Sequence, residues 1–162
     1  NLTISTCGIV PRIKEFADGG FTANLALSLH APNDALRQKL MPVARAYPLT
    51  EILSAMDEYY QKTGRRLTFE YSLISGVNDS AAQARELSSL IKGRNCLVNL
   101  IPVNEVKERE FKRSHAKNIE NFKNILEKNR INVTIRREMG SDIDAACGQL
   151  RKSYMDKGVN RE

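Results

Sequence analysis

The sequence has few cysteines and no long hydrophobic run, and both absences narrow the classes of protein that it can encode. The three cysteines, Cys7, Cys96 and Cys147, are widely spaced, so they indicate neither a secreted disulfide framework nor a closed zinc site. Only His30 and His115 could join them as metal ligands. No apolar stretch approaches the roughly 20 residues that span a bilayer. We therefore expect a globular protein of the reducing cytoplasm.

Common nucleotide-binding motifs are also missing. There is no glycine-rich phosphate loop and no dinucleotide fingerprint, and no pair of carboxylates stands out. The chain does have an excess of basic residues, with 25 Lys and Arg against 19 Asp and Glu and a net charge of +6. This excess fits a surface that faces RNA, DNA or phosphate, although many basic proteins bind none of these.

Strand-like and helix-like segments alternate along the 162 residues. Alternating apolar and polar residues predict five strands, at 2–6, 24–30, 66–74, 96–104 and 132–138. Helical spacing of apolar residues predicts helices around 11–17, over 33–40, after a cap at Thr50, after a cap at Asp79 or Ser80, and from near Ser114. Such a repeat predicts a right-handed, parallel α/β fold.

The predicted strands have one apolar face and one polar face. In NLALSLH (24–30), every second residue is a leucine, and the residues between the leucines include Ser28 and His30. A strand between two helix layers should be apolar on both faces, so the polar face should line a ligand-filled interior, as in a barrel or an open barrel. Ligands of barrels bind at the carboxyl ends of the strands, where Ser5, Ser28, His30 and Asn104 fall.

We expect residues 1–150 to form part of such a β/α barrel and residues 151–162 to form a C-terminal tail. A strand-like segment starts at the second residue of the chain. We interpret this abrupt start as the sign of a piece of a longer protein.

Five motifs, in their order along the chain, resemble the C-terminal part of a known barrel. They are TISTCGIVP (3–11), LALSLHAPND (25–34), EYSLISGVND (70–79), VNLIPVN (98–104) and GSDIDAACGQL (140–150). The family is that of the bacterial radical S-adenosylmethionine methyltransferases of dual specificity, which methylate carbon 2 of an adenosine in 23S ribosomal RNA and in transfer RNA. The resemblance covers nearly the whole chain, and SLHAPND and DIDAACGQL are its most specific parts.

The resemblance implies a role for six residues. Cys147 matches the cysteine that is methylated by S-adenosylmethionine and then carries the methyl group to the RNA. Ser5, the segment Ser28–Leu29–His30, and Asn104 match positions that contact S-adenosylmethionine. In the family, a second S-adenosylmethionine is cleaved to a 5′-deoxyadenosyl radical, which activates the methyl group on the cysteine. The resemblance also implies a reducing partner such as flavodoxin.

The family's [4Fe–4S] cluster is held by a CxxxCxxC motif, which this chain lacks. Its cysteines at positions 7, 96 and 147 are 89 and 51 positions apart. The resemblance implies that the cluster ligands, a second catalytic cysteine and an RNA-binding domain precede Asn1. We therefore expect the activity to belong to the parent protein, and this piece alone to be inactive.

Two other interpretations stay open. A sister family methylates carbon 8 of the same adenosine, confers antibiotic resistance on the ribosome and shares most of these motifs. A protein of another class, a non-catalytic RNA-binding module, could keep the barrel without the chemistry. Cys147 itself lies between small residues and could also be an ordinary buried residue of a helix.

Overall fold

Five parallel strands form one sheet in the order β1-β2-β3-β4-β5. The computed structural model describes residues 2–104 and 111–136. The strands are β1 (Leu2–Thr6), β2 (Ala23–Ser28), β3 (Leu67–Leu73), β4 (Cys96–Pro102) and β5 (Asn132–Ile135). The helices are α1 (Val10–Asp18), α2 (Asp34–Leu40), the 3-10 helix η1 (Pro42–Arg45), α3 (Leu49–Thr63), α4 (Ala81–Ile91) and α5 (Ala116–Lys128).

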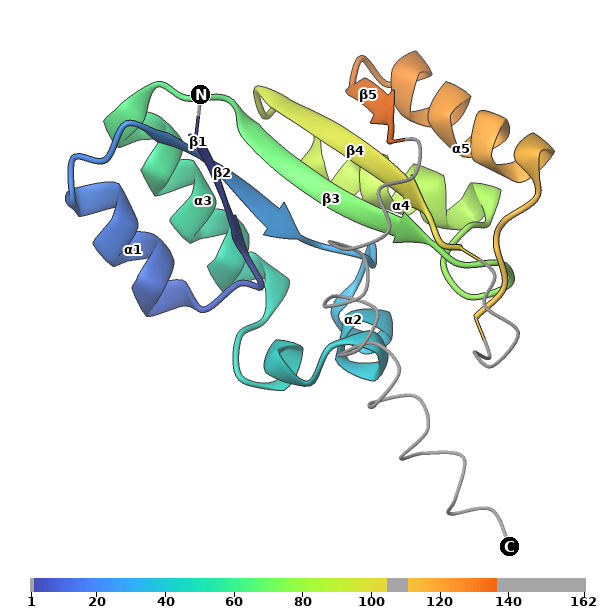
Figure 1. Ribbon diagram of the computed structural model, residues 1–162, viewed down its shortest axis with the longest axis horizontal. Helices are drawn as coiled ribbons and strands as arrows, with labels where there is room; N and C mark the ends of the chain where they lie inside the picture. The colour runs from blue at the N-terminus through green and yellow to red at the C-terminus, as the bar shows by residue number, and fades with distance from the viewer. Residues whose placement is uncertain (1, 105–110, 137–162) are drawn as a thin grey trace, which may run out of the picture.

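The spatial order of the strands follows their order in the chain, and this distinguishes the sheet from a doubly wound one. A doubly wound sheet reverses its strand order at a switch point and has helices on both faces. Here every crossover leads to the next strand in the same direction, so right-handed connections place α1, α3, α4 and α5 on one face (Figure 1). This is the arrangement of an open β/α barrel, and the predicted fold class is confirmed.

The helix-covered face of the sheet carries the main hydrophobic core. Leu25 and Leu27 of β2 are buried there with Phe69 and Tyr71 of β3. They pack with apolar residues of the four long helices, such as Ile13, Met56, Leu87 and Phe122. Burial of one side chain of this size contributes about 2 kcal/mol. The strict alternation of the strands therefore sets which face of the sheet the helices cover.

The other face of the sheet is polar, as predicted. The strand register places polar side chains side by side across it: Ser28 lies beside Glu70, Glu70 beside Asn99, and Asn99 beside Thr134. Thr134 Oγ1 donates a hydrogen bond to Asn99 Oδ1 at 3.1 Å. Within the described residues, no helix covers this face. It is the face that would line the interior of a barrel.

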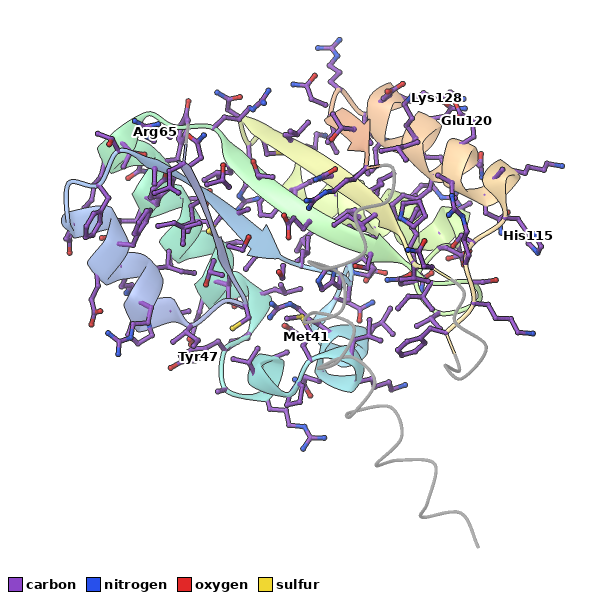
Figure 2. The ribbon with its side chains drawn as sticks, viewed as in Figure 1. Met41, Tyr47, Arg65, His115, Glu120 and Lys128 are labelled. Atoms are coloured by element: carbon purple, nitrogen blue, oxygen red, sulfur yellow. The ribbon has the colours of Figure 1, made fainter. Side chains whose placement is uncertain are left out.

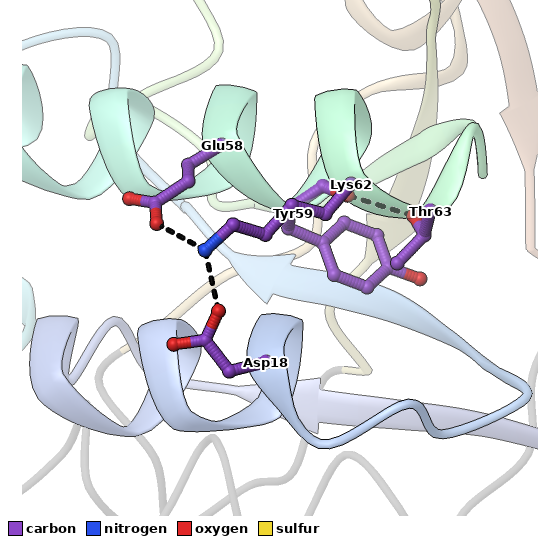
Figure 3. Close-up of polar contacts among 5 residues, drawn as sticks. All are labelled: Asp18, Glu58, Tyr59, Lys62 and Thr63. Atoms are coloured by element: carbon purple, nitrogen blue, oxygen red, sulfur yellow. Dashed lines mark hydrogen bonds and ion pairs between the residues drawn. The ribbon is translucent and has the colours of Figure 1, made fainter.

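An ion pair joins α1 to α3, and a buried hydroxyl joins α3 to the sheet. Figure 3 shows the ion pair. Lys62 of α3 donates to the carboxylates of Asp18 on α1 and Glu58 on its own helix, and both bonds raise the pKa of Lys62. The hydroxyl of Tyr59 donates to the carbonyl of Ala23 at 2.8 Å. The Tyr59 bond is buried and joins α3 to β2, whereas the exposed pair of Lys62 with Asp18 joins α3 to α1.

The start of α3 differs from the prediction. Thr50 does not cap this helix, because the N-cap residue is Pro48 and Thr50 lies inside the first turn. The free N–H of Leu49 donates instead to the carboxylate of Asp34, at 2.8 Å. Asp34 belongs to α2, so the cap comes from another helix and has no local signal in the sequence.

The start of α4 has a side-chain cap, whereas the N-cap residue of α5 makes no side-chain cap bond. Ser80, one of the two predicted caps, forms a capping box with Gln83. The other candidate, Asp79, accepts a hydrogen bond from the hydroxyl of Ser114 at 2.8 Å. Ser114 is thereby held in the loop before α5, and His115 is the N-cap residue of that helix.

No helix in 2–104 or 111–136 is long and apolar enough to cross a membrane.

Candidate functional site

The carboxyl ends of β1 and β2 meet next to α2, at the edge of the sheet where barrel ligands bind. Met41 and Tyr47 lie beside this edge, whereas Arg65 lies at the opposite edge of the sheet (Figure 2). A second group of buried apolar residues lies at the carboxyl-end edge, made of Ala31, Leu40, Met41, Ala44, Ile74, Val103 and Phe111. The loops that follow the strands are therefore packed against α2 and η1.

Arg37 of α2 is buried and binds the carbonyl groups at the ends of two strands. Its Nη2 donates to the carbonyls of Cys7 at 2.8 Å and Ser28 at 2.9 Å, and its Nε donates to the carbonyl of Leu29 at 3.1 Å. Burial lowers the pKa of Arg37 to about 10, so the guanidinium stays charged at neutral pH. Arg37 thus ties the end of β1 to the end of β2 beyond the last pair of their ladder.

Gly8 makes this close approach possible. Its φ is +99°, in the left-handed region that favours glycine. A Cβ at this position would lie 2.8 Å from Cδ1 of Ile52 and 3.3 Å from Nη2 of Arg37. The chain can therefore turn over the guanidinium only where the side chain is absent.

His30 follows β2 in a left-handed conformation with φ 59°. The side chain is 2% exposed. The backbone N–H of Ser72 donates to His30 Nδ1 at 2.9 Å. Because a backbone N–H can only donate, Nδ1 must be the unprotonated nitrogen of the ring. Burial, and after it the positive charge of Arg37, lower the pKa of His30 to about 3, so the ring is neutral and its proton is on Nε2.

The Nε2–H group of His30 is a buried donor without a hydrogen-bond partner among the described residues. Leaving such a donor unpaired costs about 1–3 kcal/mol. Nη1 of Arg37 is in the same condition within the described part of the chain. Two such donors beside the ends of β1 and β2 are suited to a ligand with oxygen or ring-nitrogen acceptors.

The predicted site residues that the structure describes lie at or near one edge of the sheet. Ser28 is the last residue of β2 and half-buried, and Ser5 is exposed on β1 beside Ala26, on the same face as Ser28. Asn104 is half-buried and lies two residues after β4. Cys147 lies outside the described residues. The contacts of these residues with a cofactor stay a prediction.

Leu29 occupies a different environment from its neighbours. Its side chain is fully buried in the main core. Its N–H donates to the carbonyl of Glu70 at 2.9 Å, and its carbonyl accepts from Arg37. Any contact of Leu29 with a cofactor would therefore have to use the backbone.

Three residues of this site were not singled out from the sequence. Arg37 reads as an ordinary basic residue of a short helix, and Ser72 as a polar position of a strand. Asn78 is fully buried and binds both the loop after β2 and the loop after β3. The only local signal is the turn composition of SGVND (75–79).

Metal ligands are not grouped in the part of the chain that the structure describes: residues 2–104 and 111–136 contain no cluster of three or more His, Cys, Asp or Glu side chains placed to hold an ion. Burial raises the pKa of Cys96 to about 11, which keeps that thiol protonated at neutral pH.

A separate hollow lies near the ends of β4 and β5, lined in part by Arg113, Glu120 and Arg136. Glu120 marks its place on α5 (Figure 2).

The sequence is similar over its whole length to part of larger methyltransferases. No family model matches it. It is 68% identical over 162 residues to a probable dual-specificity RNA methyltransferase RlmN of Lachnoclostridium phytofermentans, and 57% identical over 157 residues to the protein of the same name in Clostridium botulinum. These matches cover 100% and 97% of the chain but 46% of each relative. The chain thus spans about half the length of the curated relatives that it matches.

Two solved structures are also similar to the chain. A radical SAM methyltransferase from Sphaerobacter thermophilus matches with a TM-score of 0.83 and 50% identity, covering 92% of this chain and 44% of that protein. A domain of pyruvate-formate lyase-activating enzyme from Bacteroides vulgatus matches with a TM-score of 0.60 and 14% identity, covering 85% of this chain and all of that domain. The second match is a similarity of fold alone.

Proposed function

We propose that this chain is part of a radical S-adenosylmethionine RNA methyltransferase. The parent protein methylates carbon 2 of adenosine in 23S ribosomal RNA and in transfer RNA. The observation that carries the proposal is the 68% identity to a probable dual-specificity RNA methyltransferase over all 162 residues. The polar open face and the unsatisfied donors at the strand ends support it. The net charge of +6 is compatible with an RNA substrate.

Within this proposal, the chain provides the S-adenosylmethionine-facing ends of β1, β2 and β4. Ser5, Ser28, Leu29, His30 and Asn104 are the residues that would contact the cofactor. S-adenosylmethionine supplies the methyl group and, together with an iron–sulfur cluster, the radical that the chemistry needs. Arg37 holds the ends of β1 and β2 together through three carbonyl groups. His30 presents a neutral N–H donor, since its other ring nitrogen is occupied by Ser72.

Cys147 is the proposed methyl carrier. It lies in GSDIDAACGQL (140–150), one of the most specific parts of the family resemblance. The other two cysteines lie outside this motif: Cys7 is half-buried near Arg37, and Cys96 is buried. We place the cluster ligands and the RNA-binding domain in the rest of the parent protein. A cytoplasmic setting and a flavodoxin-like electron donor complete the proposal.

The reaction product tests the proposal directly. The whole parent protein, reconstituted with iron and sulfide without oxygen, is incubated with S-adenosylmethionine, a reductant and transcripts of 23S ribosomal RNA and transfer RNA. The nucleosides are then compared by mass spectrometry with 2-methyladenosine and 8-methyladenosine. We expect 2-methyladenosine with both RNAs. 8-Methyladenosine alone would assign the protein to the sister activity, and no methylated adenosine from a cluster-loaded protein would contradict the proposal.

The matched variants are Cys147→Ala and Cys96→Ala. Cys147→Ala should abolish methyl transfer while the visible absorption of the cluster is retained, because the cluster ligands lie elsewhere. Cys96 is the first residue of β4, at the amino-terminal edge of the sheet away from the site. Cys96→Ala should therefore keep the wild-type product.

A further inference from the structure

We propose that Asn78 is a positioning residue that holds His30 so that its Nε2–H donates a hydrogen bond to an acceptor atom of bound S-adenosylmethionine. The acceptor is an oxygen or a ring nitrogen, because only these accept from a neutral imidazole N–H. The inference rests on the proposed function, since S-adenosylmethionine is the ligand named there. It adds a residue that lies 48 positions from His30 in the sequence.

The first step concerns the contacts of Asn78, which is fully buried. Its Nδ2 donates to the carbonyl of His30 at 2.8 Å and to the carbonyl of Ser72 at 2.7 Å. Its Oδ1 accepts from the N–H of Ile74 at 2.8 Å. The hydroxyl of Tyr71 donates to the backbone carbonyl of Asn78 at 2.7 Å. The amide is thus saturated within the protein, and its role is to join two strand ends.

The second step concerns the backbone of His30. A left-handed conformation is uncommon for any residue except glycine and persists where contacts impose it. The N–H of His30 points to the carbonyl of Glu70 at 3.3 Å, and its carbonyl binds Asn78. The bond from Asn78 is the shorter of the two, and it comes from a side chain that is itself fully buried. Its loss should let this backbone relax.

The third step concerns the ring. Its Nδ1 accepts from the N–H of Ser72, and the carbonyl of the same Ser72 is held by Asn78. Asn78 therefore grips both His30 and the residue that fixes its ring. The direction of the remaining N–H donor follows from these two anchors. That donor is buried and has no partner among the described residues, which is the state expected of a donor reserved for a ligand.

Charged and titratable groups lie on the elements bonded to His30 or to its neighbours Arg37 and Asn78. Arg37 on α2 acts on the ring directly. The others are Cys7 after β1, whose carbonyl binds Arg37, Glu70 on β3, whose carbonyl accepts from the N–H of His30, and Asp79, which follows Asn78 in the chain. Asp79 is engaged with the N–H of Gly76 and the hydroxyl of Ser114. Burial and the charge of Arg37 oppose protonation of His30. The ring should therefore stay a neutral Nε2–H donor throughout the physiological pH range.

The tautomer of the wild-type ring is the first measurement, and it needs no activity. The whole parent protein is labelled with ¹⁵N-histidine, and His30→Gln identifies the His30 signals in a long-range proton–nitrogen correlation spectrum. We expect a proton on Nε2 only, unchanged between pH 8 and pH 5.5. A proton on Nδ1, a mixture of tautomers, or titration near the ordinary pKa of histidine would overturn the inference.

The second measurement compares Asn78→Asp with Asn129→Asp. The aspartate keeps the size of the side chain but loses both Nδ2 donors. Asn129 is an exposed residue at the end of α5, where its Nδ2 donates to the carbonyl of Ile125, so it controls for the added charge. We expect Asn78→Asp to weaken equilibrium binding of S-adenosylmethionine to the cluster-loaded protein about tenfold, the equivalent of one hydrogen bond. Asn129→Asp should bind within about twofold of wild type.

The pH profile separates positioning from a general structural effect. In Asn78→Asp, the freed ring should gain a titration near pH 6.5, the ordinary pKa of histidine, which the wild-type ring should lack. Wild-type affinity with an unchanged tautomer in a folded Asn78→Asp protein would overturn the inference. If this variant does not fold, a wild-type tautomer other than Nε2–H still overturns the inference. A wild-type protein that methylates no RNA would contradict the proposed function and leave the tautomer measurement intact.

Discussion

Arg37 is the residue that most directly shapes the edge of the sheet where the candidate site lies. A buried guanidinium needs partners for its donors, and here three backbone carbonyls accept from its Nε and Nη2. Those carbonyls belong to the ends of β1 and β2, next to the predicted cofactor contacts. One side chain thus sets the spacing of two strand ends that no longer pair with each other.

Replacing Arg37 with lysine tests this role. The single ammonium of a lysine cannot reproduce bonds from both Nε and Nη2, so we expect Arg37→Lys to lower the free energy of unfolding by about 2 kcal/mol. Urea unfolding of the 162-residue chain measures the loss. Arg12→Lys is the control, because the Arg12 side chain is exposed and pairs with Glu15, a neighbour on its own helix. Equal unfolding midpoints for the two variants would show that the carbonyl contacts contribute little.

The buried ring of His30 should make the free energy of unfolding depend on pH. Its pKa is about 3 in the folded protein against an ordinary 6.5, so the unfolded chain binds the proton more readily. The free energy of unfolding should therefore fall below pH 6.5, by roughly 1 kcal/mol per pH unit. This contribution is fully present above pH 6.5 and is lost as the pH falls toward 3.

Glutamine at position 30 cannot take up this proton. The unfolding free energy of His30→Gln should be lower than wild type at pH 7.5, and the difference should shrink as the pH falls to 5.5. His115→Gln, at an exposed position before α5, should keep the wild-type slope. Parallel pH profiles for wild type and His30→Gln would contradict the assignment of a neutral, buried ring.

Residue patterns alone identified the polar strand ends but not the residues that organise them. Ser28 and His30 follow from alternation at the end of a strand, which is a local signal. The binding of His30 by Ser72 and Asn78 spans 42 and 48 positions, and no local pattern encodes it. Arg37 was missed for the same reason, because its partners lie in strands that precede its helix.

At the scale of elements, periodicity was a sound guide to which segments form helices and strands. The predicted strands at 24–30, 96–104 and 132–138 ended too late. For the first of these, the left-handed backbone of His30 ends the strand although the alternation continues. The cap of α3 was misassigned because Asp34 reaches it from α2. Local patterns therefore predicted the elements, and tertiary contacts decided their ends.

The capping box of α4 gives a prediction at this scale. Ser80 Oγ accepts from the N–H of Gln83 at 3.1 Å, and removing it leaves one donor of the first turn unpaired. We expect Ser80→Ala to lower the free energy of unfolding by about 1 kcal/mol. Ser89→Ala, at an exposed position inside the same helix, should stay within about 0.5 kcal/mol of wild type. Similar values for the two variants in urea unfolding would count against the cap.

At the scale of the molecule, the sheet is open on one face. The chain spans about half the length of the curated relatives that it matches. All four long helices lie behind the other face (Figure 1). The polar face and the carboxyl-end edge meet where the predicted cofactor contacts gather.

The iron content of the chain follows from its cysteines. Their positions at 7, 96 and 147 do not form the compact three-thiolate motif that holds a [4Fe–4S] cluster. Anaerobic reconstitution of the 162-residue chain with iron and sulfide should therefore give no cluster absorption in the visible spectrum. The whole parent protein, treated in the same way, should turn brown. A stoichiometric cluster on the chain alone would contradict the division of roles between the two parts.

The central claim is that Cys147 carries the methyl group that reaches the RNA. The most direct test is mass spectrometry of peptides from the parent protein, produced in cells fed with methionine that has a deuterated methyl group. We predict a deuterated methyl group on Cys147 and none on Cys96, whose thiol stays protonated because its pKa is raised to about 11. An unmodified Cys147 in a protein that methylates RNA in the same cells would contradict the account.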